Sequence, residues 1–198
     1  MVAQEAQEVE LRGDDPVPLA KAVVQRVVEA CLAADEIGEE AREVDRVAAR
    51  DAGLPMPAAI VVFSPGLDGR TGESMDTKAG IDPFFTREGL EHTGAMYRAG
   101  QHPYQPMLSP ATLADLTGFP PMLLQAGTNE ILLDDSTRMA TRARDAGVDV
   151  ILDITADVPH VFQAFAGVLD EADEALDRAA LFLSQHIRTR DTERTSAG

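Results

Sequence analysis

Three short apolar runs, well separated along the chain, constrain its fold more than any other feature. They are AAIVVF (58–63), PPMLLQAG (120–127) and VDVILDI (148–154). Each run has the length of a strand, and its apolar character is typical of a strand that is buried on both faces of a sheet. Segments with helical periodicity lie between the runs. We therefore expect an α/β fold in which three parallel strands are flanked by crossover helices.

Helical periodicity also predicts where the helices lie. We expect one helix to begin after a capping Thr86 and another to begin at Asp134 or Asp135. The C-terminal apolar pattern predicts a long helix, which Asp170 and Glu171 either interrupt or leave continuous. The expected helices cover residues 16–38, 39–52, 87–98, 111–116, 134–144 and 161–187.

Composition narrows the classes of partner. The 198 residues carry a formal net charge of −17, which argues against nucleic acids and anionic membranes because both need a basic face. No apolar run is long enough to span a bilayer, and the N-terminus has neither the basic nor the apolar region of a secretory signal. The single cysteine, Cys31, has no partner for an internal disulfide. We therefore expect a soluble, cytoplasmic protein.

A carboxylate and an imidazole follow two successive predicted strands. Glu130 comes after the second strand and His160 after the third. Because the carboxyl ends of parallel strands meet at one edge of a sheet, the two side chains are expected near each other. A carboxylate that orients a histidine is the arrangement of a general base. On spacing alone a simpler interpretation stays open, in which the acid caps a helix and the histidine is merely exposed.

The other three histidines indicate no metal site. His92, His102 and His186 have no metal-ligand spacing with carboxylates or with Cys31. The sequence therefore implies neither a metal nor a cofactor.

From about residue 47 to residue 187 the chain resembles the C-terminal part of the hormone-sensitive-lipase-like family of α/β-hydrolase esterases. Five segments carry the resemblance, and they occur in the family's order and spacing. They are ARDAGLPMPAAIVVFSPGLD (49–68), FFTREGL (84–90), LTGFPPMLLQAGTNEILLDDS (116–136), ARDAGVDV (143–150) and VPHVFQAF (158–165). The resemblance implies a partial α/β-hydrolase fold and a carboxylic-ester hydrolase that acts on small acyl esters.

The resemblance also assigns roles to residues. The family's catalytic acid falls on Glu130 and its histidine on His160, and these two are the candidate catalytic residues. Asn129 occupies a place where an acidic residue is frequent. Asp134 matches a second acidic position, which supports the loop of the acid or caps the following helix.

The nucleophile of such an enzyme is not recognisable in this chain. A serine hydrolase needs a serine on a tight Gly-x-Ser-x-Gly turn between a strand and a helix, and the sequence contains no such motif. The segments at 72–76 and 195–198 match it only in part. The family's oxyanion-hole motif is absent as well, because the chain has no Gly-Gly pair. We therefore expect a truncated esterase that has little or no activity alone.

The resemblance divides the chain into three parts. Residues 1–46 form an acidic tail and helical segment of no recognised family, residues 47–187 form the partial hydrolase domain, and residues 188–198 form a disordered tail. The strand at 58–63 would leave one edge open, so we expect residues 17–52 or a second copy of the chain to cover it. A complementing N-terminal fragment is a further expected partner. Two alternatives stay open: half of a two-chain esterase, and a non-catalytic remnant or interaction domain.

Overall fold

The structure is a computed structural model, and it describes residues 50–54, 56–68, 72–106 and 108–196, with side chains as far as residue 187. Its strands are β1 (Ile60–Phe63), β2 (Met122–Gly127) and β3 (Val150–Thr155). They form one parallel sheet in the order β1-β2-β3. The predicted α/β class with three parallel strands flanked by helices is confirmed.

Each strand begins two residues later than the apolar run that predicted it, at Ile60, Met122 and Val150. For β2 the cause lies in the sequence, since the run opens with Pro120 and Pro121. Proline has no N–H to donate to a strand ladder. Pro121 still accepts a hydrogen bond from the N–H of Ile60 through its carbonyl oxygen. Apolar character alone therefore overstates the length of the strand.

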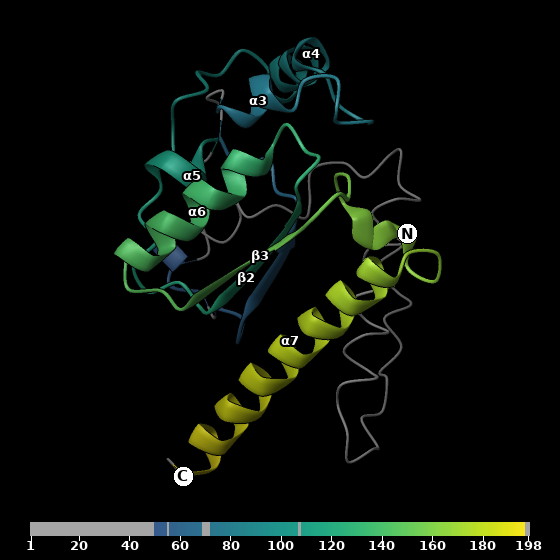
Figure 1. Cartoon of the computed structure of the whole chain (residues 1–198). Coiled ribbons are helices and arrows are strands. Elements are labelled where there is room, and N and C mark those ends of the chain that lie inside the picture. Colours follow the sequence, from purple (N-terminus) through teal and green to yellow (C-terminus); the bar gives the residue numbers. More distant parts are fainter. Residues whose placement is uncertain (1–49, 55, 69–71, 107, 197–198) are drawn as a thin grey trace, which may run out of the picture.

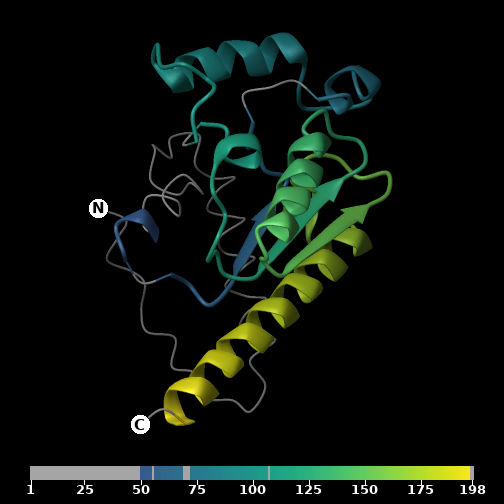
Figure 2. The same ribbon diagram turned by 90° about the vertical axis from the view of Figure 1, so that its left-hand side faces the viewer.

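Helices cover both faces of the sheet (Figures 1 and 2). On one face, α6 (Leu133–Asp145) packs on the even-numbered strand residues, and α5 (Pro110–Leu113) lies beside it. On the other face, α7 (Asp170–Ser196) packs on odd-numbered residues such as Leu123. Successive side chains of a strand point to opposite faces, so a strand whose residues are all apolar supplies both layers.

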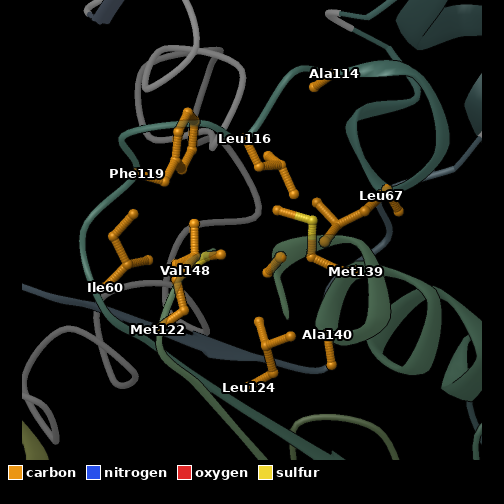
Figure 3. Packing of buried hydrophobic residues seen from close by; sticks show 12 residues of the cluster. Ile60, Leu67, Ala114, Leu116, Phe119, Met122, Leu124, Met139, Ala140 and Val148 are labelled. Carbon is orange, nitrogen blue, oxygen red and sulfur yellow. The ribbon is translucent and has the colours of Figure 1, made fainter. Parts of the chain in front are cut away.

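The larger of the two cores lies between the sheet and α6. Figure 3 shows its side chains, and they come from the strands, from α5 and α6, and from the loops that follow β1, α5 and α6. The buried members are Ile60, Leu67, Ala111, Ala114, Leu116, Phe119, Met122, Leu124, Met139, Ala140, Ala143 and Val148. Leu67 joins this core from the loop after β1 and thereby fixes the course of that loop.

The C-terminal helical pattern is divided. A short 3-10 helix, η1 (Phe162–Phe165), follows β3, and α7 begins only at Asp170. A continuous helix over 161–187 is therefore wrong, and the alternative with a break near Asp170 is confirmed. Gly167 lies in the break with a φ of 79°, which a helix does not allow. Residues 188–196, which we expected to belong to a disordered tail, continue α7.

Two further helices, α3 (Ser74–Thr77) and α4 (Arg87–Arg98), lie beyond the carboxyl ends of the strands (Figures 1 and 2). Thr86 caps α4 as predicted, because its side chain accepts a hydrogen bond from the N–H of Gly89. No residue of α4 is buried. Among the described residues, no helix is both long enough and apolar enough to cross a membrane. The predicted helix over 16–38 and most of that over 39–52 lie outside the described residues.

Candidate active site

The carboxyl ends of the three strands bring Ser64, Glu130 and His160 together. In register, Phe63 of β1 is opposite Gln125 of β2, and Gly127 of β2 is opposite Thr155 of β3. The loops that follow the strands therefore leave the sheet at the same edge. Nδ1 of His160 lies 3.1 Å from Oε2 of Glu130. The predicted proximity of the carboxylate and the imidazole is thus observed.

Glu130 is fully buried, and hydrogen bonds reach both of its carboxylate oxygens. Oε2 faces the imidazole of His160, while Oε1 accepts hydrogen bonds from the N–H of Gly127 and from the hydroxyl of Ser64, the latter at 2.7 Å. A buried carboxylate is tolerated only when donors replace its water. All three of these contacting groups belong to this chain.

His160 is oriented from two sides. Its Nδ1 contacts Glu130, and the ring of Phe85 packs edge-on against the imidazole with centroids 4.6 Å apart. The side chain is 18% exposed, whereas that of Glu130 is 1% exposed. The imidazole thus forms the solvent-facing end of a pair whose carboxylate is enclosed. This arrangement can transfer a proton at the second ring nitrogen, Nε2, while the carboxylate holds Nδ1.

Gly127 permits the close contact between the loops of the acid and the histidine. A Cβ atom on Gly127 would lie 2.2 Å from the carbonyl oxygen of Val158. That carbonyl also accepts a hydrogen bond from the N–H of Asn129. On the other side of the crossing, the N–H of Asp157 donates to the hydroxyl of Thr128 at 2.8 Å. The loop that carries His160 therefore lies directly on the end of β2.

Asp82 joins the segment of Phe85 to the loop of Glu130. Its Oδ1 accepts hydrogen bonds from the N–H groups of Phe84 and Phe85, and its Oδ2 accepts one from the N–H of Ile131 at 2.9 Å. The residue is only 8% exposed. One carboxylate thereby positions both the ring that touches His160 and the residue after Glu130.

Asp134 connects the same loop to α3. Its Oδ2 accepts a hydrogen bond from the N–H of Ser74, and the hydroxyl of Ser74 donates to the carbonyl of Ile131. Asp134 therefore supports the region around the acid, one of the two roles expected for it, and it does not cap α6, whose N-cap is Leu132. Ser74 lies in the first partial match to the nucleophile motif, and it is buried with its hydroxyl bonded in this way.

Asp135 fixes the loop that follows β1. Its Oδ2 accepts hydrogen bonds from the N–H groups of Leu67 and Asp68, and its Oδ1 accepts one from the guanidinium of Arg138 at 2.6 Å. Burial nevertheless raises the pKa of the Asp135 carboxyl from 3.8 to about 6, although these hydrogen bonds oppose the shift. The loop from Ser64 to Asp68 is therefore fastened to the start of α6.

The remaining histidines lie in other surroundings. His186 on α7 bonds the carbonyl of Phe182, and Nδ1 of His102 accepts from the N–H of Tyr104. His92 is exposed on α4. Within the described part of the chain, no group of three or more histidine, cysteine, aspartate or glutamate side chains is placed to hold a metal ion.

Several residues of this arrangement have no clear signal in a single sequence. Ser64, Asp82 and Phe85 lie in loops where polar and aromatic residues are common, and only their spatial neighbours reveal what they do. Gly127 is the exception. A glycine at the end of a buried apolar strand is a recognised sign that another backbone approaches closely.

Comparison with known sequences places this geometry in context. Residues 43–164 match the model of a family described as the alpha/beta hydrolase fold. A curated acetyl-hydrolase of Streptomyces hygroscopicus is 36% identical over 153 residues, which are 77% of this chain and 51% of that protein. An esterase of Acinetobacter venetianus is 36% identical over 129 residues, 64% of this chain and 42% of the relative. The chain thus spans about half the length of the curated relatives it matches.

Solved structures agree with the sequence comparison. An esterase from the bacterial hormone-sensitive lipase family superposes with a TM-score of 0.70 at 44% identity, over 73% of this chain and 48% of that one. The hormone-sensitive lipase homologue EstE7, from a metagenome library, superposes with a TM-score of 0.70 at 36% identity, over 73% of this chain and 50% of the other. Each superposition thus covers about three quarters of this chain and about half of the other one.

Proposed function

The chain belongs to the α/β-hydrolase fold family, among the esterases related to hormone-sensitive lipase, and we propose that it carries the base and the orienting acid of a carboxylic-ester hydrolase. The observation that supports this most directly is the contact between His160 and the fully buried carboxylate of Glu130. The substrate would be a small acyl ester, in keeping with the acetyl-hydrolase and the esterase among its relatives.

In this mechanism His160 moves the proton and Glu130 stays ionised. A serine hydroxyl attacks the ester carbonyl carbon as its proton passes to Nε2 of His160. The imidazolium then donates that proton to the departing alcohol. Water repeats the sequence on the acyl-enzyme and releases the acid. Throughout, Glu130 accepts from Nδ1, so that the ring keeps the correct tautomer and its positive charge is stabilised.

The serine and the oxyanion-hole donors would come from polypeptide outside residues 47–187, the segment that resembles the family. The sequence has no Gly-x-Ser-x-Gly turn, and the chain spans about half the length of its curated relatives. A complementing fragment would have to present its serine to the exposed face of His160. We therefore expect this chain alone to hydrolyse esters slowly or not at all.

Complementation tests the proposal. The chain is produced alone and also fused to the fragment of a related esterase that carries the Gly-x-Ser-x-Gly turn. Hydrolysis of a short p-nitrophenyl ester should be near background for the chain alone and should rise well above it in the fusion. His160→Ala should abolish the gain, while His186→Ala, which alters a histidine on α7, should not. A fusion whose activity is unaffected by His160→Ala would contradict the proposed base.

A second candidate, a non-catalytic remnant or interaction domain, is favoured by the missing nucleophile turn. A serine-directed fluorophosphonate distinguishes the two functions. If a serine of the fusion is labelled, and if His160→Ala prevents that labelling, the result supports the esterase function. If neither the chain nor the fusion is labelled, the non-catalytic function is the better account.

A further inference from the structure

One buried hydroxyl, that of Ser64, bonds to the acid and to the loop of the histidine. It donates to Oε1 of Glu130 at 2.7 Å and accepts from the N–H of Val161, the residue after His160, at 2.9 Å. Ser64 itself is the first residue after β1 and is 3% exposed. A single side chain therefore connects the ends of all three strands at the point where the acid and the base meet.

The backbone at both ends of this connection adopts an unfavourable conformation. Ser64 has a φ of 45° and Val161 a φ of 47°, in the left-handed region that residues other than glycine seldom occupy. For a β-branched residue such as valine this conformation is a genuine outlier. Such strain persists only where the surroundings enforce it, and it concentrates at functional sites. The hydroxyl of Ser64 is the group that both strained residues share.

The same hydrogen bonds assign the two carboxylate oxygens to different tasks. Because Ser64 and Gly127 both donate to Oε1, that oxygen is occupied, and Oε2 is the one directed at Nδ1 of His160. The hydrogen bond from the N–H of Val161 to the Ser64 hydroxyl holds the backbone at the residue after His160. Without the hydroxyl, the carboxylate could rotate and the histidine loop would lose a tether.

We propose that Ser64 is a positioning residue that sets the His160–Glu130 geometry through its hydroxyl. The catalytic importance of this role rests on the proposed function. The effect on the orientation and tautomer of the His160 imidazole does not, and it can be measured separately. Ser64 does not act as the nucleophile, because it is buried and its hydroxyl proton is directed at Glu130. Its contribution is to keep Nδ1 protonated and facing the acid, with Nε2 available as a base.

The test reads the tautomer of His160 by long-range 1H–15N NMR through the non-exchangeable ring protons, so it needs neither substrate nor nucleophile. In the unaltered chain His160 should be mainly the Nδ1–H tautomer when the ring is neutral. Removal of the Ser64 hydroxyl takes one hydrogen bond from the Glu130 carboxylate. This loss should shift the tautomer ratio of His160 about tenfold toward Nε2–H, the form that a free imidazole prefers. We expect this shift in both Ser64→Ala and Ser64→Gly.

The two variants separate the hydroxyl from the backbone. Glycine adopts a φ of 45° without strain, so Ser64→Gly should fold even if Ser64→Ala does not. Ser184→Ala removes another buried serine hydroxyl, one that donates to a carbonyl within α7, and should leave the tautomer unchanged. The proposal is overturned if His160 keeps the Nδ1–H tautomer in Ser64→Gly. It is also overturned if His160 already has the Nε2–H tautomer in the unaltered chain. An inactive fusion with the expected tautomers would instead count against the esterase function alone.

Discussion

At the scale of single residues, the site depends on carboxylates that are buried and hydrogen-bonded. Asp82 and Asp135 each accept hydrogen bonds from backbone N–H groups that are distant in the sequence. Glu130 accepts one from the hydroxyl of the equally distant Ser64. A carboxylate has several acceptor positions and can therefore hold two loops at once. The same property makes each of them costly to remove, since the donors left behind are buried.

Glu130→Ala should lower the free energy of unfolding by about 2–3 kcal/mol, because the hydroxyl of Ser64 and the N–H of Gly127 lose their acceptor in a buried site. Urea unfolding followed by circular dichroism measures the change. Glu91→Ala, at an exposed position on α4, is the matched control and should change the stability by less than about 0.5 kcal/mol. Equal effects of the two substitutions would argue that Glu130 is not held as described.

Asp135 should make the protein more stable in mild acid. Its folded pKa of about 6 lies above its ordinary value of 3.8, so the folded state binds the proton first as the pH falls. Stability should therefore rise by about 1 kcal/mol between about pH 7 and pH 5, and this gain should be lost again as the pH rises through 6. Urea titrations of the unaltered chain and of Asp135→Asn isolate the effect. Parallel pH profiles for the two proteins would refute it.

At the scale of helices and strands, periodicity predicted the existence and type of the elements better than their ends. The sheet was predictable because its strands are apolar on both faces, and α4 was predictable because Thr86 is a standard cap. The pattern over 161–187 was misleading, since apolar residues continue at helical spacing through Gly167 and its positive φ. A few backbone angles, which spacing does not reveal, decide where η1 ends and α7 begins.

Gly127→Ala should separate the two site loops. The added Cβ would lie 2.2 Å from the carbonyl oxygen of Val158, which is backbone and cannot rotate away. We expect a loss of about 2 kcal/mol or more in the free energy of unfolding. A displaced His160 ring signal in the NMR spectrum should accompany it.

Gly66→Ala provides the comparison for this substitution. A Cβ there would meet Leu132 at 3.7 Å, an ordinary contact, so this variant should retain both the stability and the His160 signal. If Gly127→Ala behaves like Gly66→Ala, the close crossing of the loops is not a constraint in solution.

At the scale of the whole molecule, the parallel sheet decides which parts of the site could be predicted from the sequence. The proximity of Glu130 and His160 was predictable because the two residues follow successive parallel strands. The side chains that hold them were not, since Ser64 and Asp82 contact the pair from loops whose approach is set by tertiary packing. Within the described residues β1 pairs only with β2, and its other edge is the open end of the sheet.

Deletion of residues 1–46 should promote self-association. An unpaired edge of an apolar strand such as β1 is a template for another chain. Analytical ultracentrifugation over a range of concentrations should show larger species for the shortened chain than for the full one. A shortened chain that remains a stable monomer would contradict the expectation that residues 17–52 or a second copy covers this edge.

The donors to the Glu130 carboxylate have a practical consequence. Ser64, Gly127 and His160 all belong to one polypeptide, which therefore carries both members of the proposed acid–base pair and the groups that contact its carboxylate. Such a chain would suit a split-enzyme reporter, in which the nucleophile half is attached to one protein of interest and this half to another. Ester hydrolysis would then signal that the two attached proteins have come together.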